Sequence, residues 1–229
     1  MQVNWQHYSL KQLHDNATQS FRAGGGSRPD VLLIEINDQK AVLKDQNSAD
    51  PWFARIVGPL LNWRECKGLR RLVAASSIPN LLAVPDTRSF LMSFHESQQI
   101  TRVDTNEVDW EAFFSKLKSA IDQIHALGVA HNDLRNPSNI LITKDGDPIL
   151  VDLVACFCRG RKWNLINRWL FNKFCQVDHS AVTKLKQRVA PHLVLDSDIH
   201  AEAIAGRTGM SARRFGQWVR KVSRQLFTK

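Results

Sequence analysis

The sequence is poor in the features that define several protein classes. It holds four cysteines in 229 residues, and their spacing shows no disulfide framework of the kind found in small secreted proteins. No apolar run approaches the 18 residues that a membrane-spanning helix needs. The first residues lack a basic segment followed by an apolar one, so no signal peptide is predicted. We therefore expect a protein of the reducing cytoplasm, with enough hydrophobic residues (43%) for a conventional core.

Acidic residues are scarce in the last third of the chain. Residues 1–154 hold 16 Lys and Arg against 18 Asp and Glu, a net charge of −2, whereas residues 155–229 hold 15 against 4, a net charge of +11. A surface this basic favours a polyanionic partner, such as nucleic acid, anionic lipid headgroups or an acidic protein. A solvated basic face without a partner is the alternative.

Turn residues and hydrophobic periodicity predict strands first and helices last. Residues 31–36 and 41–45 read as a hairpin across the polar turn NDQK, and residues 78–85 and 89–94 as two further strands. A second hairpin should turn at Asp145-Gly146. Helices are expected within 52–75, where Gly58-Pro59 starts or breaks the helix, and over 109–127, 162–175, 178–190, 199–206 and 211–226. This order suggests two unequal lobes, connected near residues 93–98.

The helix over 109–127 has the clearest pattern. Asp109 can cap it and Gly128 can end it. Its predicted buried stripe consists of Trp110, Phe113, Leu117, Ile121 and Ile124.

Several residues occur along the chain in an order that suits phosphoryl transfer. A glycine-rich turn, Gly24–Gly26, lets backbone N–H groups approach phosphate oxygens. Lys44 ends a predicted strand and offers a compact positive charge, which Glu65 on the next helix can hold in place. The stretch HNDLRNPSNIL (131–141) then places an aspartate and an asparagine in a polar loop between apolar segments.

Two carboxylates and an amide complete the set. Asp133 can position or deprotonate an attacking hydroxyl, while Asn139 and Asp152 can hold the Mg²⁺ that bridges phosphate oxygens. Such chemistry is mostly positioning and charge neutralisation, so it needs these groups on rigid strands and short loops. Each residue type also has an ordinary interpretation: turn residues that cap backbone groups, solvated surface charges, and a flexible glycine linker.

The order and spacing resemble the protein-kinase-like superfamily. AVLK (41–44) is similar to its strand lysine motif, HNDLRNPSNIL to its catalytic loop, and ILVDLV (149–154) stands where D-F-G would. Within the superfamily the chain looks most like small bacterial enzymes similar to RIO kinases and to lipopolysaccharide-core (Kdo/heptose) sugar kinases. The resemblance implies a bilobal α+β fold with a small β-rich N-lobe (1–95), a trimmed helical C-lobe (96–195) and a basic helical tail (196–229).

The resemblance also implies a role for each residue. Asp133 would be the catalytic aspartate, Lys44 the phosphate-binding lysine and Glu65 its partner. His131 would be a scaffold residue that bonds backbone near the metal aspartate. The ligands of Mg²⁺ would be Asn139 and Asp152. The residues that bind ATP would be Lys44 together with Gly24, Gly25, Gly26, Phe94 and His95, the last two in a hinge over residues 93–96 that meets the adenine.

The chain departs from ordinary protein kinases at several points. Asn139 follows Asp133 by six residues, one more than usual, and a looped-out residue near Pro137 would absorb the difference. Val154 replaces the glycine of D-F-G, the glycine turn reads G-G-G-S, and no A-P-E sequence follows. These features argue against an activation loop and against the usual peptide-binding platform.

The sequence thus predicts a cytoplasmic, ATP- and Mg²⁺-dependent kinase that phosphorylates a protein Ser/Thr or a sugar hydroxyl. The basic segment 159–174, with Trp163, Ile166, Leu170 and Phe174 on one side, packs against the C-lobe in the favoured interpretation. Peripheral contact with the inner face of an anionic membrane is the alternative. Cys156 and Cys158 form a C-x-C pair that we interpret as buried or half-buried thiols, since no second pair or nearby histidine completes a metal site.

A second hypothesis comes from the tail. Residues 201–222 loosely resemble the helix-turn-helix of AraC-type regulators, with Arg213, Arg214, Gln217 and Arg220 facing a groove. The alternative function is therefore a nucleotide-binding module of low turnover whose tail binds DNA or another polyanion. Nucleic acid is the less favoured partner, because such short patterns also arise by chance in helical tails.

Overall fold

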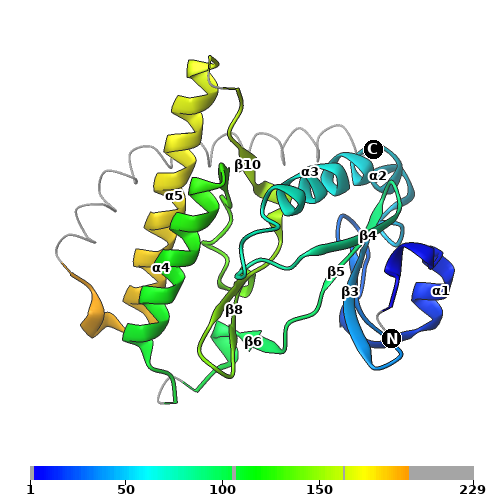
Figure 1. Cartoon of the computed structure of the whole chain (residues 1–229), viewed down its shortest axis with the longest axis horizontal. Coiled ribbons are helices and arrows are strands. Elements are labelled where there is room, and N and C mark those ends of the chain that lie inside the picture. The colour runs from blue at the N-terminus through cyan, green and yellow to red at the C-terminus, as the bar shows by residue number, and fades with distance from the viewer. Residues whose placement is uncertain (1–2, 105–106, 162, 196–229) are drawn as a thin grey trace.

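The computed structural model describes residues 3–104, 107–161 and 163–195 (Figure 1). Its first part is a five-stranded antiparallel sheet with the spatial order β1-β2-β3-β5-β4. The strands are β1 (Ala17–Arg22), β2 (Asp30–Ile36), β3 (Gln39–Asp45), β4 (Leu81–Asp86) and β5 (Ser89–Ser93). The β2–β3 hairpin turns through Asn37 and Asp38, whose φ angles are 49° and 61°. Because Asn and Asp tolerate this left-handed region, the predicted hairpin forms, and it is confirmed.

Three helices accompany this sheet. Helix α1 (Leu10–Asp15) begins with a capping box between Ser9 and Gln12. Helices α2 (Pro51–Ile56) and α3 (Gly58–Arg71) are separated at Val57, so the predicted interruption at Gly58-Pro59 is confirmed. Proline is tolerated in the first turn of α3 because that N–H has no partner within the helix. Helix α3 contacts β4 and β5 and buries Glu65 on its inner side.

Short strands follow the connection over residues 94–96. Strands β6 (Ser97–Gln99), β8 (Ile140–Thr143) and β9 (Pro148–Leu150) form one small sheet, and β7 (Val129–Ala130) pairs with β10 (Phe157–Cys158). The β8–β9 hairpin turns at Gly146, whose φ is 73°, as predicted. The polar loop 131–136 therefore lies between β7 and β8. Five 3₁₀ turns complete the described chain: η1 (Trp5–His7), η2 (Ile100–Arg102), η3 (Pro137–Asn139), η4 (Leu153–Ala155) and η5 (Pro191–Leu193).

Helix α4 (Trp110–Ala126) forms as its pattern predicts. Asp109 caps it by accepting a hydrogen bond from the N–H of Ala112 at 3.0 Å, and Gly128 follows with a φ of 81°. The predicted stripe is buried and forms part of the main core, which also takes in side chains of α3, α5, β5 and β8. A smaller core lies between the sheet and the N-terminal segment, around Leu13, Ile34 and Leu91.

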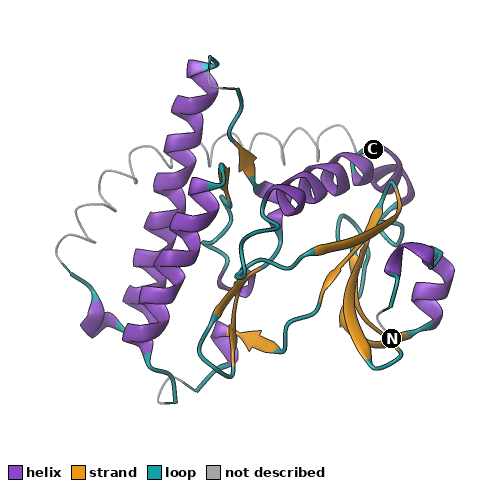
Figure 2. Ribbon diagram, in the orientation of Figure 1, coloured by secondary structure: helices purple, strands orange, loops and turns teal. Residues whose placement is uncertain are grey.

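Helix α5 (Leu165–Val189) corrects two predictions. It is one continuous helix of 25 residues beside α4 (Figure 2), whereas the sequence predicts separate helices over 162–175 and 178–190. Nothing between 165 and 189 breaks a helix, and Asp178, which resembles a helix cap, lies buried in the middle. The predicted packing face is wrong at Trp163 and Ile166, which are each 75% exposed. Its other members, Leu170 and Phe174, are half-buried, and the ring of Phe174 contacts that of Phe157. The predicted helices 199–206 and 211–226 lie outside the described residues.

The described lobes agree with the predicted α+β class. Among the described residues, no helix combines the length and the apolar character that crossing a bilayer requires.

Candidate active site

Lys44, near the end of β3, stands at the centre of the site. The residue is 4% exposed, and its neighbours across the sheet are Val31 and Phe90. Nζ donates to both carboxylate oxygens of Glu65, at 3.0 Å to Oε1 and 2.8 Å to Oε2, and to Oδ1 of Asp152 at 2.8 Å. The structure therefore brings together three predicted site residues from β3, α3 and the segment after β9.

Lys44 and Asp152 hold each other in the charged form, whereas burial raises the pKa of Glu65 above its ordinary value. Burial alone would lower the pKa of Lys44, but the attraction of Glu65 and Asp152 outweighs burial and raises that pKa above its ordinary value. For Asp152, burial would raise the pKa, but the ammonium of Lys44, helped by the charge of Arg22, holds it below its ordinary value. Both groups are thus charged at neutral pH. Arg22, at the end of β1, is a cation of this site that the sequence patterns do not single out.

Asp152 adopts an uncommon backbone conformation. Its φ and ψ are both 68°, in the left-handed region, where residues other than glycine are infrequent. The next N–H, of Leu153, donates to Oε1 of Glu65 at 3.2 Å. Glu65 therefore holds both the Lys44 ammonium and the backbone that follows Asp152, which fixes the direction of the Asp152 carboxylate. Strained conformations of this kind are concentrated at functional sites.

Asp133 and Asn139 are in direct contact. Nδ2 of Asn139 donates to the backbone oxygen and to Oδ2 of Asp133, both at 3.0 Å. Between them lies the 3₁₀ turn η3, which begins at Pro137 and is capped by Asn136. The N–H of Val151 donates to the backbone oxygen of Asn139 at 3.0 Å, so this loop lies beside the segment that carries Asp152.

Asn139 and Asp152 offer the oxygen donors that a magnesium ion takes. Mg²⁺ is bound in proteins through carboxylate and amide oxygens. Asn139 is 2% exposed, and its amide nitrogen bonds to Asp133. Its side-chain oxygen accepts only a long hydrogen bond from Asn136, at 3.5 Å, and is the atom that could bind a metal. Asp152 is charged and uses only Oδ1 for Lys44. The chemistry of these residues therefore fits a divalent cation.

His131 and Asp178 hold the polar loop in place through hydrogen bonds. Nε2 of His131 donates to the backbone oxygen of Val151 at 3.0 Å, next to Asp152. The fully buried carboxylate of Asp178, on α5, accepts the N–H of His131 at 2.8 Å and that of Asn132 at 2.7 Å. Asn132 itself has a φ of 65°.

Asp178 is a site residue that the sequence analysis missed. It also accepts a hydrogen bond from Nε2 of His125 on α4 at 2.9 Å, so it joins α4, α5 and the loop. Its signal in the sequence is faint: it is one of the few acidic residues after residue 154, and it interrupts the apolar pattern of α5.

The glycine turn connects β1 to β2. Gly25 and Gly26 have φ angles of 144° and 58°, and a Cβ at Gly24 would lie 2.0 Å from Oγ of Ser48. Glycine is therefore required at each of these positions. The N–H of Gly24 donates to Asp30, and the oxygen of Gly26 accepts from Asp50, at 2.6 and 2.8 Å. The structure describes a tight turn rather than a loose linker, and its role toward phosphate stays a prediction.

Phe94, in the predicted hinge, stacks on an aromatic side chain of β1. The ring of Phe94 lies nearly parallel to that of Phe21 on β1, with centroids 6.4 Å apart and planes at 8°. Nε2 of His95 lies 3.1 Å from Oγ of Ser93, and burial lowers the pKa of His95, so its ring is neutral at pH 7. Phe21, which is 47% exposed, was missed by the sequence analysis. Its contact spans 73 positions of the chain, and no local pattern records it.

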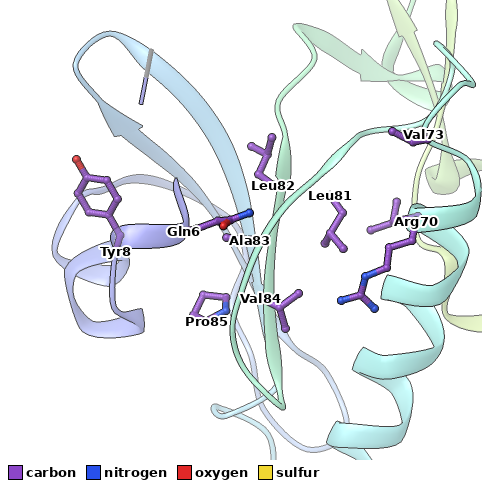
Figure 3. A pocket seen from close by; sticks show the side chains of 10 residues that line it. Gln6, Tyr8, Arg70, Val73, Leu81, Leu82, Ala83, Val84 and Pro85 are labelled. Atoms are coloured by element: carbon purple, nitrogen blue, oxygen red, sulfur yellow. The ribbon is translucent and has the colours of Figure 1, made fainter. Parts of the chain in front are cut away.

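A groove of about 560 Å³ lies elsewhere on the same lobe (Figure 3). It is lined by the end of α3, by β4 and by the N-terminal turn, including Arg70, Val73, Val84 and Tyr8. None of its lining residues belongs to the candidate site.

Two solved structures of the Rio2 kinase from Chaetomium thermophilum are similar to this chain. One aligns with a TM-score of 0.58 at 15% sequence identity, covering 83% of this chain and 64% of that chain. The other is the Rio2 kinase–ADP/Mg²⁺–phosphoaspartate complex, with a TM-score of 0.57, 16% identity, and coverage of 83% and 62%. The chain thus spans less than two thirds of the length of these structures. No protein-family model and no curated protein sequence matches it.

The structural likeness covers 83% of this chain. It agrees with the fold that the motifs of the sequence predict. The chain thus has a fold similar to that of the Rio2 kinase structures.

Proposed function

We propose that this chain is an ATP-dependent phosphotransferase that moves the γ-phosphate to a hydroxyl group of a protein Ser/Thr or of a sugar. The observation that carries the proposal is the buried Lys44 ammonium between the carboxylates of Glu65 and Asp152. Burying three charges is expensive, and well-packed apolar side chains of similar volume would stabilise a fold at least as well. Such a cluster is therefore better explained by a charged ligand than by stability alone.

Each residue of the site has a role in the proposed reaction. Lys44 contacts phosphate oxygens, and Glu65 keeps the ammonium aimed at them. A Mg²⁺ ion held by Asn139 and Asp152 would neutralise the charge on the phosphates. Asp133, fixed by Asn139, orients the acceptor hydroxyl and takes its proton.

The adenine is expected between the two lobes, beside Phe94 and His95. Phe21 and Phe94 offer flat apolar surfaces for a base. The Rio2 complex, which contains ADP and Mg²⁺, supports ATP and Mg²⁺ as the ligands at the level of the shared fold. We propose a cytoplasmic location, where ATP is abundant.

The proposal is tested by incubating the purified chain with γ-labelled ATP and Mg²⁺, alone and with a cell-envelope extract. Asp133→Asn should lower transfer by roughly 10²–10⁴-fold, the usual contribution of a general base, and Asp152→Ala should abolish it. Asp147→Asn is the matched control, because Asp147 lies on the nearby β8–β9 turn and forms an exposed ion pair with Lys116 at 2.6 Å. It should behave like the wild type.

The labelled fraction identifies the acceptor class, protein or glycolipid. Because the second Rio2 structure contains a phosphoaspartate, hydroxylamine treatment should separate acyl phosphate on the chain itself from phosphate on a hydroxyl. ATP binding without transfer to any fraction would favour the nucleotide-binding module instead. A chain that does not bind ATP would overturn the proposal.

A further inference from the structure

The N-terminal end of α5 projects from the C-lobe (Figure 1) and carries an apolar surface. Trp163, Leu165 and Ile166 are 75%, 72% and 75% exposed, and Trp169 is 59% exposed. We call these four residues the α5 tip. Leu165 and Ile166 lie on the same side of the helix as Trp169, because Trp169 follows them by four and three residues, while Phe171 belongs to the packed face.

The α5 tip exposes a large apolar area within a short stretch of chain. Two tryptophans and two branched aliphatic side chains, all more than half exposed, lie between residues 163 and 169. Together they expose apolar area on the order of 500 Å². The largest apolar patches on soluble monomers have this size and are often functional, which makes the tip a candidate binding surface.

The charges around the tip are all of one sign. The stretch 153–177 contains five Lys and Arg and no Asp or Glu. Arg161 and Arg168, which neighbour the tip residues in the chain, are exposed, and Nζ of Lys173 lies 5.9 Å from the ring centre of Trp169. A partner must therefore accept apolar side chains and offer negative charge at the same place.

An anionic bilayer meets both conditions. Tryptophan prefers the interface between headgroups and acyl chains, aliphatic side chains enter the acyl region, and basic residues pair with anionic headgroups. A symmetric contact with a second copy would instead place two wholly cationic segments against each other. Phosphates of a nucleic acid would satisfy the arginines but would leave Leu165 and Ile166 without a partner.

We infer that the α5 tip docks on the surface of an anionic lipid bilayer, at headgroup depth and without crossing it. The position of the tip then sets the position of the catalytic loop. Asp178, which holds that loop, follows Ile166 by 12 residues, or about 18 Å along the helix axis. If the proposed function is correct, the acceptor hydroxyl lies near the membrane surface; docking itself does not depend on that function.

The test is co-sedimentation of the full chain with vesicles, without nucleotide. Vesicles of phosphatidylcholine with 30% phosphatidylglycerol should bind the chain, and vesicles of phosphatidylcholine alone should bind it far less. Salt should weaken the binding. The double substitution Trp163→Ser/Trp169→Ser should lower the apparent affinity at least about tenfold, because it removes two large apolar side chains from the contact.

The matched control is Trp63→Ser on α3. Trp63 is 56% exposed and has Lys67 over its ring at 4.9 Å, the same arrangement as Trp169 with Lys173. This variant should bind anionic vesicles like the wild type. Circular dichroism and melting curves should show all variants folded, since only exposed side chains change.

Three results would overturn the inference. The first is a wild type that does not co-sediment with anionic vesicles and is monomeric by light scattering. That result would mean that the chain itself covers the tip. The second is a dimer that the double substitution separates, which would assign the tip to a second copy. The third is an equal loss of vesicle binding in Trp63→Ser, which would show that adhesion is unspecific.

Discussion

Replacing Asp178 with asparagine should destabilise the protein, because its carboxylate is a buried acceptor for three donors. The fully buried carboxylate accepts hydrogen bonds from the N–H groups of His131 and Asn132 and from Nε2 of His125, at 2.7 to 2.9 Å. Asparagine has the same shape but presents an NH₂ group in place of one oxygen. In either orientation of the amide, a donor therefore faces a donor.

The expected loss follows from these contacts. A hydrogen bond to a charged group contributes about 1.5–3 kcal/mol, and a buried N–H without a partner costs about 1–3 kcal/mol. Because the amide can still accept part of the network, we expect a loss of about 3 kcal/mol in the free energy of unfolding. For a chain of this length, that corresponds to a fall of roughly 6–12 °C in Tm. Phosphotransfer should fall as well, because the backbone before Asp133 loses its support.

Urea unfolding and thermal melting measure this loss. The comparison variant is Asp147→Asn, whose carboxylate is 54% exposed and lies 2.6 Å from Nζ of Lys116. An exposed pair contributes little, so this variant should lose less than about 0.5 kcal/mol. The reasoning is refuted if Asp178→Asn is also within about 0.5 kcal/mol of the wild type.

Two further predictions concern titrating groups. The hydrogen bond from Cys156 and the charge of Arg71 lower the pKa of Cys158 to about 6, whereas burial raises that of Cys175 to about 12. At pH 7, iodoacetamide should therefore alkylate Cys158 at least about tenfold faster than Cys175 by peptide mass spectrometry, and equal rates would contradict this. The folded-state pKa of Asp152 is below its ordinary 3.8, so its pairing stabilises the fold above that pH and is lost in acid. The stability difference between wild type and Asp152→Asn in urea should thus narrow below about pH 4, and a constant difference from pH 3 to 7 would disprove the assignment.

The elements that the sequence predicts well depend on neighbours along the chain. The two hairpins follow from turn residues that accept positive φ, and α4 follows from a cap and a stripe within one helix. The predicted site residues could also be found, because each stands in a short motif beside a strand or turn. Their convergence on Lys44 is a property of the structure, since Asp152 lies 108 positions away.

The features that the sequence does not predict depend on distant contacts. Asp178 resembles a helix cap by its type and position, and only the backbone of the polar loop, 46 and 47 residues earlier, explains why it is buried within α5. The same holds for Phe21, whose partner Phe94 lies in the connection after β5. The face of α5 that carries Trp163 and Ile166 has the periodicity of a packed helix, and only the absence of a covering element among the described residues reveals its exposure.

The continuity of α5 has a mechanical consequence. A helix without a break transmits displacement along its axis, whereas two helices with a joint between them would absorb it. Because the tip leads directly into the uninterrupted helix that carries Asp178, a displacement of the tip would be passed to the residue that holds the N–H groups of His131 and Asn132. The exposed end of α5 and the support of the loop at His131 are thus parts of one rigid element.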